Sequence, residues 1–332
     1  MNSNMHKKRK ILTVLSLPPF VYVLATGSFW AQPRVPLYRL GYRDLRYPLF
    51  SQIPADGCYI TSLAAATDGR VFGATTGFRS YLFVFSQKTD QVKPLGHLPG
   101  CEGAHHSQVI GKDGRLFLGG GKNVIQPFPI SKRSGGGFNW VSEDLWQQVE
   151  EQYRGYPGGH LYLYHPAQEE GEWRDDKPLK VIDLGIPVPG DGIYCLAIDP
   201  VKELLYGISY PHGHFFLHEI KSGSTKDLGV IFRDVVFGGP DIRTLRSLPR
   251  NLAADKDGSV YASTDGGKLL RYNPFSQQIQ TLEVSLPGES MQVVEAWAVG
   301  EEVLYGGTSE GFIFRLHGRS QKVENLGKPL VA

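Results

Sequence analysis

Residues 191–229 read DGIYCLAIDPVKELLYGISYPHGHFFLHEIKSGSTKDLG, and this stretch decides the fold. Its apolar runs at 193–198, 204–209 and 215–220 have the length of short strands, and the polar residues between them mark turns. A further polar turn leads to the closing Asp-Leu-Gly at 227–229. The stretch therefore predicts four short strands in one meander.

Similar meanders recur along the chain. They cover residues 59–100, 101–185 and 191–229, and two more have their turns at 257–258 and 301–302. A unit of about 40 to 50 residues with four strands is typical of a β-propeller blade. The sequence predicts an all-β propeller with five visible repeats, which form either a five-bladed ring or part of a larger one. Residues 38–50 are expected to offer an additional outer strand.

Composition limits the classes of function. A net charge of +2 on 332 residues argues against nucleic acid, which requires a basic stripe. The chain has neither a P-loop nor a dinucleotide fingerprint, and it lacks a Gly-x-Ser-x-Gly elbow. With three cysteines there is no disulfide framework, although Cys58 and Cys101 precede equivalent strands and suit a pair across neighbouring blades. Cys195 lies in an apolar strand and is expected to be buried.

The first 31 residues differ from the rest. Lys7, Lys8, Arg9 and Lys10 precede an apolar run at 11–25 and then small residues, which is the order of a secretory signal peptide. Because the apolar stretch continues to Ala31, an uncleaved membrane anchor is the alternative. Both interpretations place the propeller domain, residues 36–332, outside the cytoplasm. With a signal peptide the domain is secreted or periplasmic, and with an anchor it is tethered to the membrane.

The second repeat carries a long insertion at 121–158, between its second and third strands. It includes a predicted helix at 142–153, and long loops of this kind are typically lids or binding elements. Five aromatic residues, four of them in the insertion, are candidates for stacking on sugar rings: Tyr81, Trp140, Trp146, Tyr153 and Tyr156.

The propeller topology brings distant residues to one mouth of the central channel. Aligned on their polar turns, the repeats place Thr61, His106, Tyr194, Arg250 and Val294, with Glu295 beside it, at equivalent positions where the innermost strands begin. Loops on the same face add further polar residues: His105, Tyr210, His212, His214, Arg243 and Arg246. A mouth lined by His, Tyr and Arg, with Trp140 in the insertion above it, predicts a site for an anionic ligand such as a carboxylated or sulfated sugar polymer.

Each of these features has a structural alternative. His105 and His106 also suit a solvated loop, and the arginines suit an ordinary charged surface. The His-x-His spacing of His212 and His214 is compatible with a divalent metal, but no matching carboxylate is evident, so we expect no cofactor. His160, His165 and His218 lie on predicted third strands and are expected to be structural.

Residues 205–216, LYGISYPHGHFF, followed by TKDLG at 225–229, resemble secreted bacterial propellers related to polysaccharide lyases of the ulvan and oligogalacturonate type. The resemblance covers the repeat region from about residue 59. It implies β-elimination on a uronic-acid polymer, in which the enzyme neutralises the carboxylate, removes the adjacent proton and protonates the leaving oxygen.

The resemblance also implies roles for residues. Arg246 or Arg250 neutralises the carboxylate, Tyr210 or Tyr194 acts as base and acid, and His105 or His106 shares the proton transfer. Independently of the resemblance, the position of further residues at the mouth makes them candidates for substrate binding: Thr61, His212, His214, Arg243, Glu295 and Trp140. The alternatives are a non-catalytic propeller that binds a protein or ligand at the same mouth, and a homologue that has kept the fold and lost the chemistry.

Overall fold

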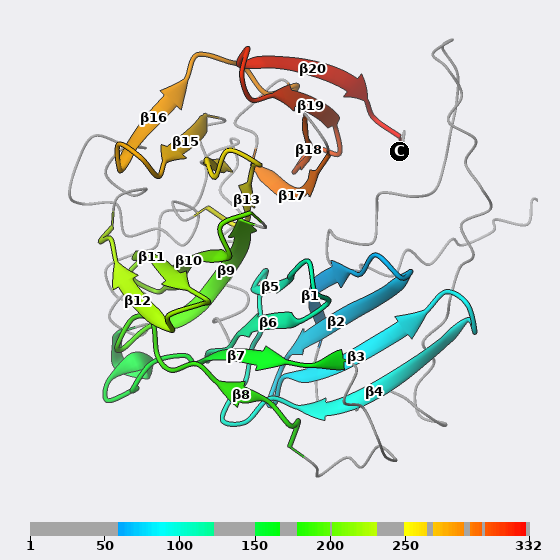
Figure 1. Ribbon diagram of the computed structural model, residues 1–332, viewed down its shortest axis with the longest axis vertical. Coiled ribbons are helices and arrows are strands. Elements are labelled where there is room, and N and C mark those ends of the chain that lie inside the picture. The colour runs from blue at the N-terminus through cyan, green and yellow to red at the C-terminus, as the bar shows by residue number, and fades with distance from the viewer. Residues whose placement is uncertain are drawn as a thin grey trace, which may run out of the picture.

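The structure is a computed structural model and describes residues 59–122, 150–166, 178–199, 201–230, 249–263, 268–288, 293–300 and 303–329. These residues form five antiparallel sheets of four strands each. Figure 1 shows the sheets arranged around a common centre, from β1–β4 in blue and cyan to β17–β20 in orange and red. The arrangement is a β-propeller with five blades, and it confirms the all-β class and the five repeats predicted from the sequence.

The blades follow one another along the chain. Blade 1 contains β1 (Tyr59–Ala65), β2 (Arg70–Thr76), β3 (Tyr81–Ser86) and β4 (Gln91–His97). Blade 2 contains β5 (Gln108–Ile110), β6 (Leu116–Gly119), β7 (Leu161–Tyr164) and β8 (Ile182–Asp183). Blade 3 contains β9 (Gly192–Asp199), β10 (Leu204–Tyr210), β11 (Phe215–Glu219) and β12 (Ser224–Asp227). Blade 4 contains β13 (Leu252–Ala254), β14 (Val260–Ser263), β15 (Leu269–Asn273) and β16 (Gln278–Leu282). Blade 5 contains β17 (Val294–Val299), β18 (Leu304–Thr308), β19 (Ile313–His317) and β20 (Lys322–Gly327).

Each blade is a simple meander in which neighbouring strands in the sheet are consecutive in the chain. The first strands of successive blades contact one another, β1 with β5, β5 with β9, β9 with β13 and β13 with β17. They are therefore the inner strands, and Figure 1 shows them nearest the centre. We call the face where the inner strands begin the mouth face, and the face with the turns between first and second strands the turn face.

The glycines of the second strands have a steric role. Gly73 pairs with Phe83, Gly207 with Phe216 and Gly306 with Phe314. A Cβ atom added at these glycines would lie 2.0, 2.2 and 2.2 Å from the facing ring, far inside van der Waals contact. Each ring therefore lies directly on the glycine backbone, which explains why glycine recurs at this position of the second strands.

The closing turns of the blades also repeat one contact. The side chains of Asp183, Asp227 and Asn325 each accept a hydrogen bond of 2.8 Å from the backbone N–H two residues later. The donors are Gly185, Gly229 and Gly327, all with positive φ. An Asx turn followed by a left-handed residue needs Asp or Asn and then Gly, so the Asp-Leu-Gly pattern reflects turn geometry.

The apolar core lies between neighbouring blades. Tyr206 and Phe215 of blade 3 share one buried cluster with Tyr272 of blade 4, and the rings of Phe215 and Tyr272 are 5.0 Å apart in an edge-to-face arrangement. Such packing holds the blades at a constant spacing around the centre. It thereby positions the inner strands that carry the mouth face.

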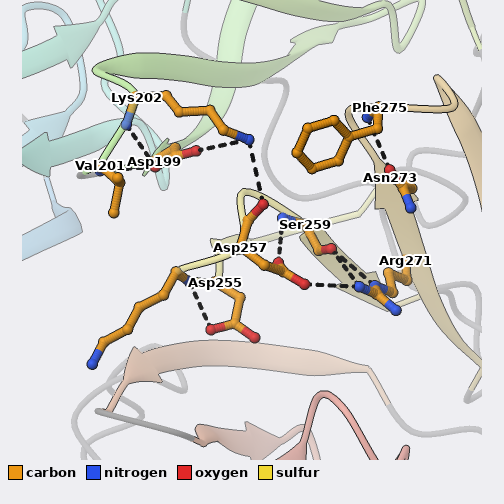
Figure 2. Close-up of polar contacts among 10 residues, drawn as sticks. Asp199, Val201, Lys202, Asp255, Asp257, Ser259, Arg271, Asn273 and Phe275 are labelled. Atoms are coloured by element: carbon orange, nitrogen blue, oxygen red, sulfur yellow. Dashed lines mark hydrogen bonds and ion pairs between the residues drawn. The ribbon is translucent and has the colours of Figure 1, made fainter.

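Polar contacts join blades 3 and 4 on the turn face (Figure 2). Asp199 accepts hydrogen bonds from the backbone N–H groups of Val201 and Lys202. The Lys202 ammonium lies 3.3 Å from the carbonyl oxygen of Asp257 in the next blade and 4.4 Å from the ring centroid of Phe275. Lys202 therefore connects the first turn of one blade to two turns of its neighbour.

Several predicted features lie partly or wholly outside the described residues. Residues 150–153 form a helical turn at the end of the predicted helix, whereas 1–58 and 123–149 are not described. Cys101 is a buried free thiol that hydrogen-bonds to the Gly103 carbonyl oxygen, and Cys195 is also free and buried, as expected for the latter. Within the described ranges, no helix has the length and apolarity needed to span a membrane.

Candidate functional site

Three of the five equivalent mouth positions are β-bulges. The pairing register skips Thr61 in β1, Tyr194 in β9 and Glu295 in β17. A bulge inserts one extra residue, interrupts the alternation of the strand and re-aims a side chain. Glu295, rather than its neighbour Val294, therefore takes the equivalent position in blade 5.

The mouth positions of neighbouring blades contact one another. The Thr61 hydroxyl donates to the Ala104 carbonyl oxygen of blade 2 at 2.8 Å. The ring centroids of His106 and Tyr194 are 6.2 Å apart, edge to face. Arg250 forms an ion pair of 2.6 Å with Glu295, and its charge also acts on His106. The structure thus brings together residues from all five blades.

A row of rings runs across the mouth face at blades 2 and 3. His105 and Tyr194 have ring centroids 5.6 Å apart, Tyr194 and Tyr210 5.9 Å, and Tyr210 and Tyr153 5.7 Å. Tyr153 continues to Tyr156 at 5.5 Å. We call these rings, with His106, the aromatic row: His105, His106, Tyr194, Tyr210, Tyr153 and Tyr156. The last two come from the described end of the insertion and lie in this row.

The aromatic row is held in its neutral form. Burial lowers the pKa of His105 to about 4, although a hydrogen bond with the Lys122 backbone raises it slightly. Burial and the charges of His105 and Arg250 lower the pKa of His106 to about 3. Burial raises the pKa of the Tyr153, Tyr156 and Tyr210 hydroxyls well above their usual range. At neutral pH the row carries no charge of its own.

Cations lie at both ends of the row. The Lys122 ammonium is 5.1 Å from the ring centroid of Tyr156 and 5.7 Å from that of Tyr153, and it also donates to the Gln152 carbonyl oxygen. Arg250 lies at the other end, beside His106. Its side chain is 30% exposed although it is paired with Glu295.

A buried carboxylate organises the loop after β10. Asp191 is 2% exposed, and its Oδ2 accepts from the Ser209 hydroxyl at 2.5 Å and from the His212 backbone N–H at 3.1 Å. Its Oδ1 is hydrogen-bonded to Nδ1 of His212. The His212 side chain is 45% exposed, so a buried carboxylate orients a ring that reaches solvent.

His212 and His214 bind different carboxylates. His214 Nδ1 lies 2.8 Å from Asp227 of β12, and His160 makes the equivalent 2.8 Å contact with Asp183 of β8. The repetition of this pair in two blades indicates a structural contact for His214. Among the residues that the structure describes, no group of three His, Cys, Asp or Glu side chains could hold a metal ion.

The remaining site residues predicted from the sequence lie outside the described ranges: Trp140, Arg243, Arg246 and, among the stacking candidates, Trp146. Tyr81 packs edge to face on His97 and is 5% exposed. Sequence reasoning missed Asp191, Ser209 and Lys122. Asp191 opens the quoted stretch, so its position before an inner strand was the available signal.

The chain matches no protein-family model and no curated protein. Solved structures share the fold. A structural genomics protein of unknown function from Bacteroides thetaiotaomicron has a TM-score of 0.51 at 14% identity, and the match covers 82% of this chain and 62% of that one. A chain of the nidogen/laminin complex has a TM-score of 0.47 at 11% identity, with 81% and 80% covered.

The fold and the site define a β-propeller with an aromatic and polar mouth face. At these sequence identities the similarity to solved structures concerns the fold alone, and folds of this kind carry many functions. The function must therefore be argued from the site.

Proposed function

We propose that this protein is an extracytoplasmic β-propeller that binds an anionic carbohydrate polymer at its mouth face. The observation that carries the proposal is the neutral aromatic row with a cation at each end, Lys122 and Arg250. Tyr194, which contacts both histidines and Tyr210 in the row and is only partly buried, supplies the ring on which a sugar stacks.

The chemistry of the row fits an acidic sugar. Sugar rings have apolar C–H faces that lie on aromatic side chains, and a polar group at the rim fixes their orientation. A carboxylate or sulfate on the same sugar pairs with a lysine or arginine at the edge of the platform. Because the histidines of the row are neutral, the attraction for an anion comes from Lys122 and Arg250.

The extracytoplasmic location rests on the sequence of residues 1–31, with its basic cluster, apolar run and small residues. A fusion of the full chain to a reporter that is active only outside the cytoplasm tests it. Reporter activity that disappears when residues 1–31 are deleted supports the location, and activity confined to the cytoplasm contradicts it.

Binding is tested with a panel of oligosaccharides of galacturonic, glucuronic and mannuronic acid by isothermal titration calorimetry. Tyr194→Ala should weaken binding about tenfold, which corresponds to about 1.4 kcal/mol. Phe275→Ala is the matched control, because Phe275 is an aromatic residue that is 80% exposed on the turn face. Equal affinity of both variants and the unaltered protein would place the site elsewhere.

A second candidate function, β-elimination on a uronic-acid polymer, is favoured by the Asp191–His212 pair. A buried carboxylate that accepts from Nδ1 orients an imidazole as a general base. Tyr210, two residues earlier, has a raised pKa, which suits the acid that protonates the leaving oxygen. This reading therefore assigns proton abstraction to His212, and Arg250 neutralises the sugar carboxylate.

Ultraviolet absorbance of the unsaturated product tests this second candidate on the same oligosaccharides. The unaltered protein should form the product, and His212→Ala should abolish it while binding persists. His106→Ala and Tyr210→Phe test two of the residues to which the resemblance gives a part in the proton transfer. Binding without product in the unaltered protein supports the non-catalytic alternative.

A further inference from the structure

Phe78 and Phe275 are the most exposed large apolar side chains that the structure describes, at 81% and 80%. The ring of Phe275 lies on the turn face and already has a partner, since the Lys202 ammonium is 4.4 Å from its centroid. Phe78 is followed by Arg79, which is also exposed. We call Phe78 and Arg79 the rim pair, because together they present a ring and a cation to solvent.

The rim pair lies on the mouth face, in the loop between β2 and β3. Before this loop, the Thr75 hydroxyl accepts a hydrogen bond of 2.9 Å from the backbone N–H of Tyr81. In blade 3 the Ser209 hydroxyl makes the same contact, also at 2.9 Å, with the backbone N–H of His214. The loop that Ser209 closes carries His212 of the candidate site. The rim pair therefore belongs to the loop of blade 1 that is equivalent to the His212 loop.

Backbone hydrogen bonds hold the rim pair against blade 2. The N–H of Gly77 donates to the carbonyl oxygen of Glu102, and the N–H of Ser80 to that of Cys101, both at 2.9 Å. On its other side the segment 101–103 donates two bonds, of 2.9 and 3.0 Å, to the carbonyl oxygen of Gly121. The loop is thus fixed on both sides of the rim pair, and its two exposed side chains have a defined place.

Three backbone segments lie side by side as a result: the loop with the rim pair, residues 101–103, and residues 121–122. Neighbouring paired segments are about 4.8 Å apart, so the rim-pair loop lies roughly 10 Å from the Lys122 backbone. The Lys122 ammonium, 5.1 Å from the ring centroid of Tyr156, is one end of the aromatic row. The rim pair therefore extends the mouth face beyond this end of the row.

We propose that Phe78 and Arg79 form a second carbohydrate subsite, so that an acidic oligosaccharide extends from the aromatic row across residues 101–103 to the rim of blade 1. The inference rests on the proposed function and deepens it, because it specifies a ligand of several sugar units. The exposed Phe78 ring accepts the apolar face of a sugar. The Arg79 guanidinium pairs with a carboxylate or sulfate of the same chain.

The charges along this path favour acidic groups at its two ends. Lys122 and Arg79 are cations, whereas Glu102 on the segment between them is exposed and carries a negative charge. An acidic group of the ligand is attracted to either end and repelled in the middle. The path therefore suits an oligosaccharide that spans both ends better than a single acidic sugar.

The test is a calorimetric titration with the disaccharide and the hexasaccharide of the same uronic acid. The unaltered protein should bind the hexasaccharide more tightly, because only the longer chain reaches both subsites. Phe78→Ala and Arg79→Gln should each weaken binding of the hexasaccharide by about threefold to tenfold. Neither should change the affinity for the disaccharide.

Phe275→Ala and Arg70→Gln are the matched controls. Phe275 is the other highly exposed ring, and Arg70 begins β2 on the turn face, at the opposite end of the strand that leads to the rim pair. Both controls should bind the two oligosaccharides as the unaltered protein does. Because Phe78 and Arg79 are exposed, their variants should also unfold at the same temperature as the unaltered protein.

The two proposals fail separately. Equal affinity of the Phe78→Ala/Arg79→Gln double variant and the unaltered protein for the hexasaccharide overturns the second subsite and leaves carbohydrate binding standing. An equal loss of affinity for both oligosaccharides also overturns it, because the rim pair would then act at the same place as the aromatic row. If the unaltered protein binds no oligosaccharide of the panel, the proposed function is overturned, and the second subsite with it.

Discussion

The turn face and the mouth face of this propeller are stabilised by contacts of different range in the sequence. On the turn face, Asp68 bonds to Arg70 and Asp113 to Arg115, each two residues apart. On the mouth face, Asp191 bonds to His212 across 21 residues and Arg250 to Glu295 across 45. The turn face also has contacts between blades, such as that of Lys202 with Asp257 across 55 residues, but its Asp-capped turns close locally, whereas these mouth contacts form only after distant segments have packed.

The difference concerns how the side chains of each face are positioned. Local contacts on the turn face satisfy each turn by itself, since the Asp side chain caps its own turn. The mouth face instead joins segments from different blades, as in the Arg250–Glu295 ion pair and the contact of His106 with Tyr194.

The largest expected difference between the faces concerns their carboxylates. Asp191→Ala removes the acceptor of three hydrogen bonds and should lower the free energy of unfolding by about 2–4 kcal/mol. Asp113→Ala, the control on the turn face, removes a largely exposed pair and should cost about 0–1 kcal/mol. Urea unfolding measures both. Equal losses would contradict the contrast between the faces.

The second prediction concerns pH and His105 of the mouth face. Its pKa is 6.5 in the unfolded chain and about 4 in the folded protein. Between these two pH values the imidazole of the unfolded chain is protonated, whereas that of the folded protein is not. The free energy of unfolding should therefore decrease as the pH is lowered from 6.5 to about 4. For one histidine the decrease is at most about 1.4 kcal/mol per pH unit. Above pH 6.5 this histidine should have no effect.

Urea unfolding at several pH values checks this prediction, with His105→Gln as the variant. The variant should lose part of the pH dependence below pH 6.5. His214→Gln, which removes a histidine bonded to Asp227 near the surface, is the control and should retain the dependence. If both variants follow the unaltered protein, His105 does not cause the pH dependence.

Ion pairs of the two faces should differ by a smaller amount. Arg250→Met breaks a pair whose Glu295 side chain is 14% exposed, and should cost about 1–2 kcal/mol because the carboxylate loses its partner. Arg115→Met on the turn face breaks a pair with Asp113, which is 47% exposed, and should cost about 0–1 kcal/mol. Added salt should reduce only the second effect.

The smallest expected effect concerns His214 and tests whether it belongs to the site. His214→Gln and the equivalent His160→Gln should each cost less than about 1 kcal/mol, since both pairs are partly exposed. Neither should change the affinity for uronic-acid oligosaccharides in calorimetric titration. A large loss of affinity in His214→Gln, but not in His160→Gln, would show that His214 belongs to the binding site.

Much of the fold could be predicted because its signals are local. The Asp-Leu-Gly closures and aromatic-Gly second strands identify turns and strands within a few residues, and their recurrence identifies blades. The equivalent mouth positions Thr61, His106, Tyr194 and Arg250 followed from aligning the repeats. The alignment placed Val294 at this position in blade 5, with Glu295 next to it. A bulge shifts the register by one residue, and the alternation of the sequence does not reveal the bulge.

The partners within the site could not be predicted in the same way. Asp191 and Ser209 are ordinary residues at the ends of strands, and their contact with His212 depends on how the loop after β10 folds back on the start of β9. The burial that neutralises His105 and His106 depends on neighbouring blades. Such properties arise from packing, which the local pattern does not contain.

The sequence by itself determined the strands, the turns, the repeat and therefore the class of fold, because each depends on residues only a few positions apart. Only the tertiary structure decided which side chains meet at the mouth and which of them are charged. Those contacts join residues that lie as many as 45 positions apart, and both the distance between such residues and their access to water are set by the packing of whole blades.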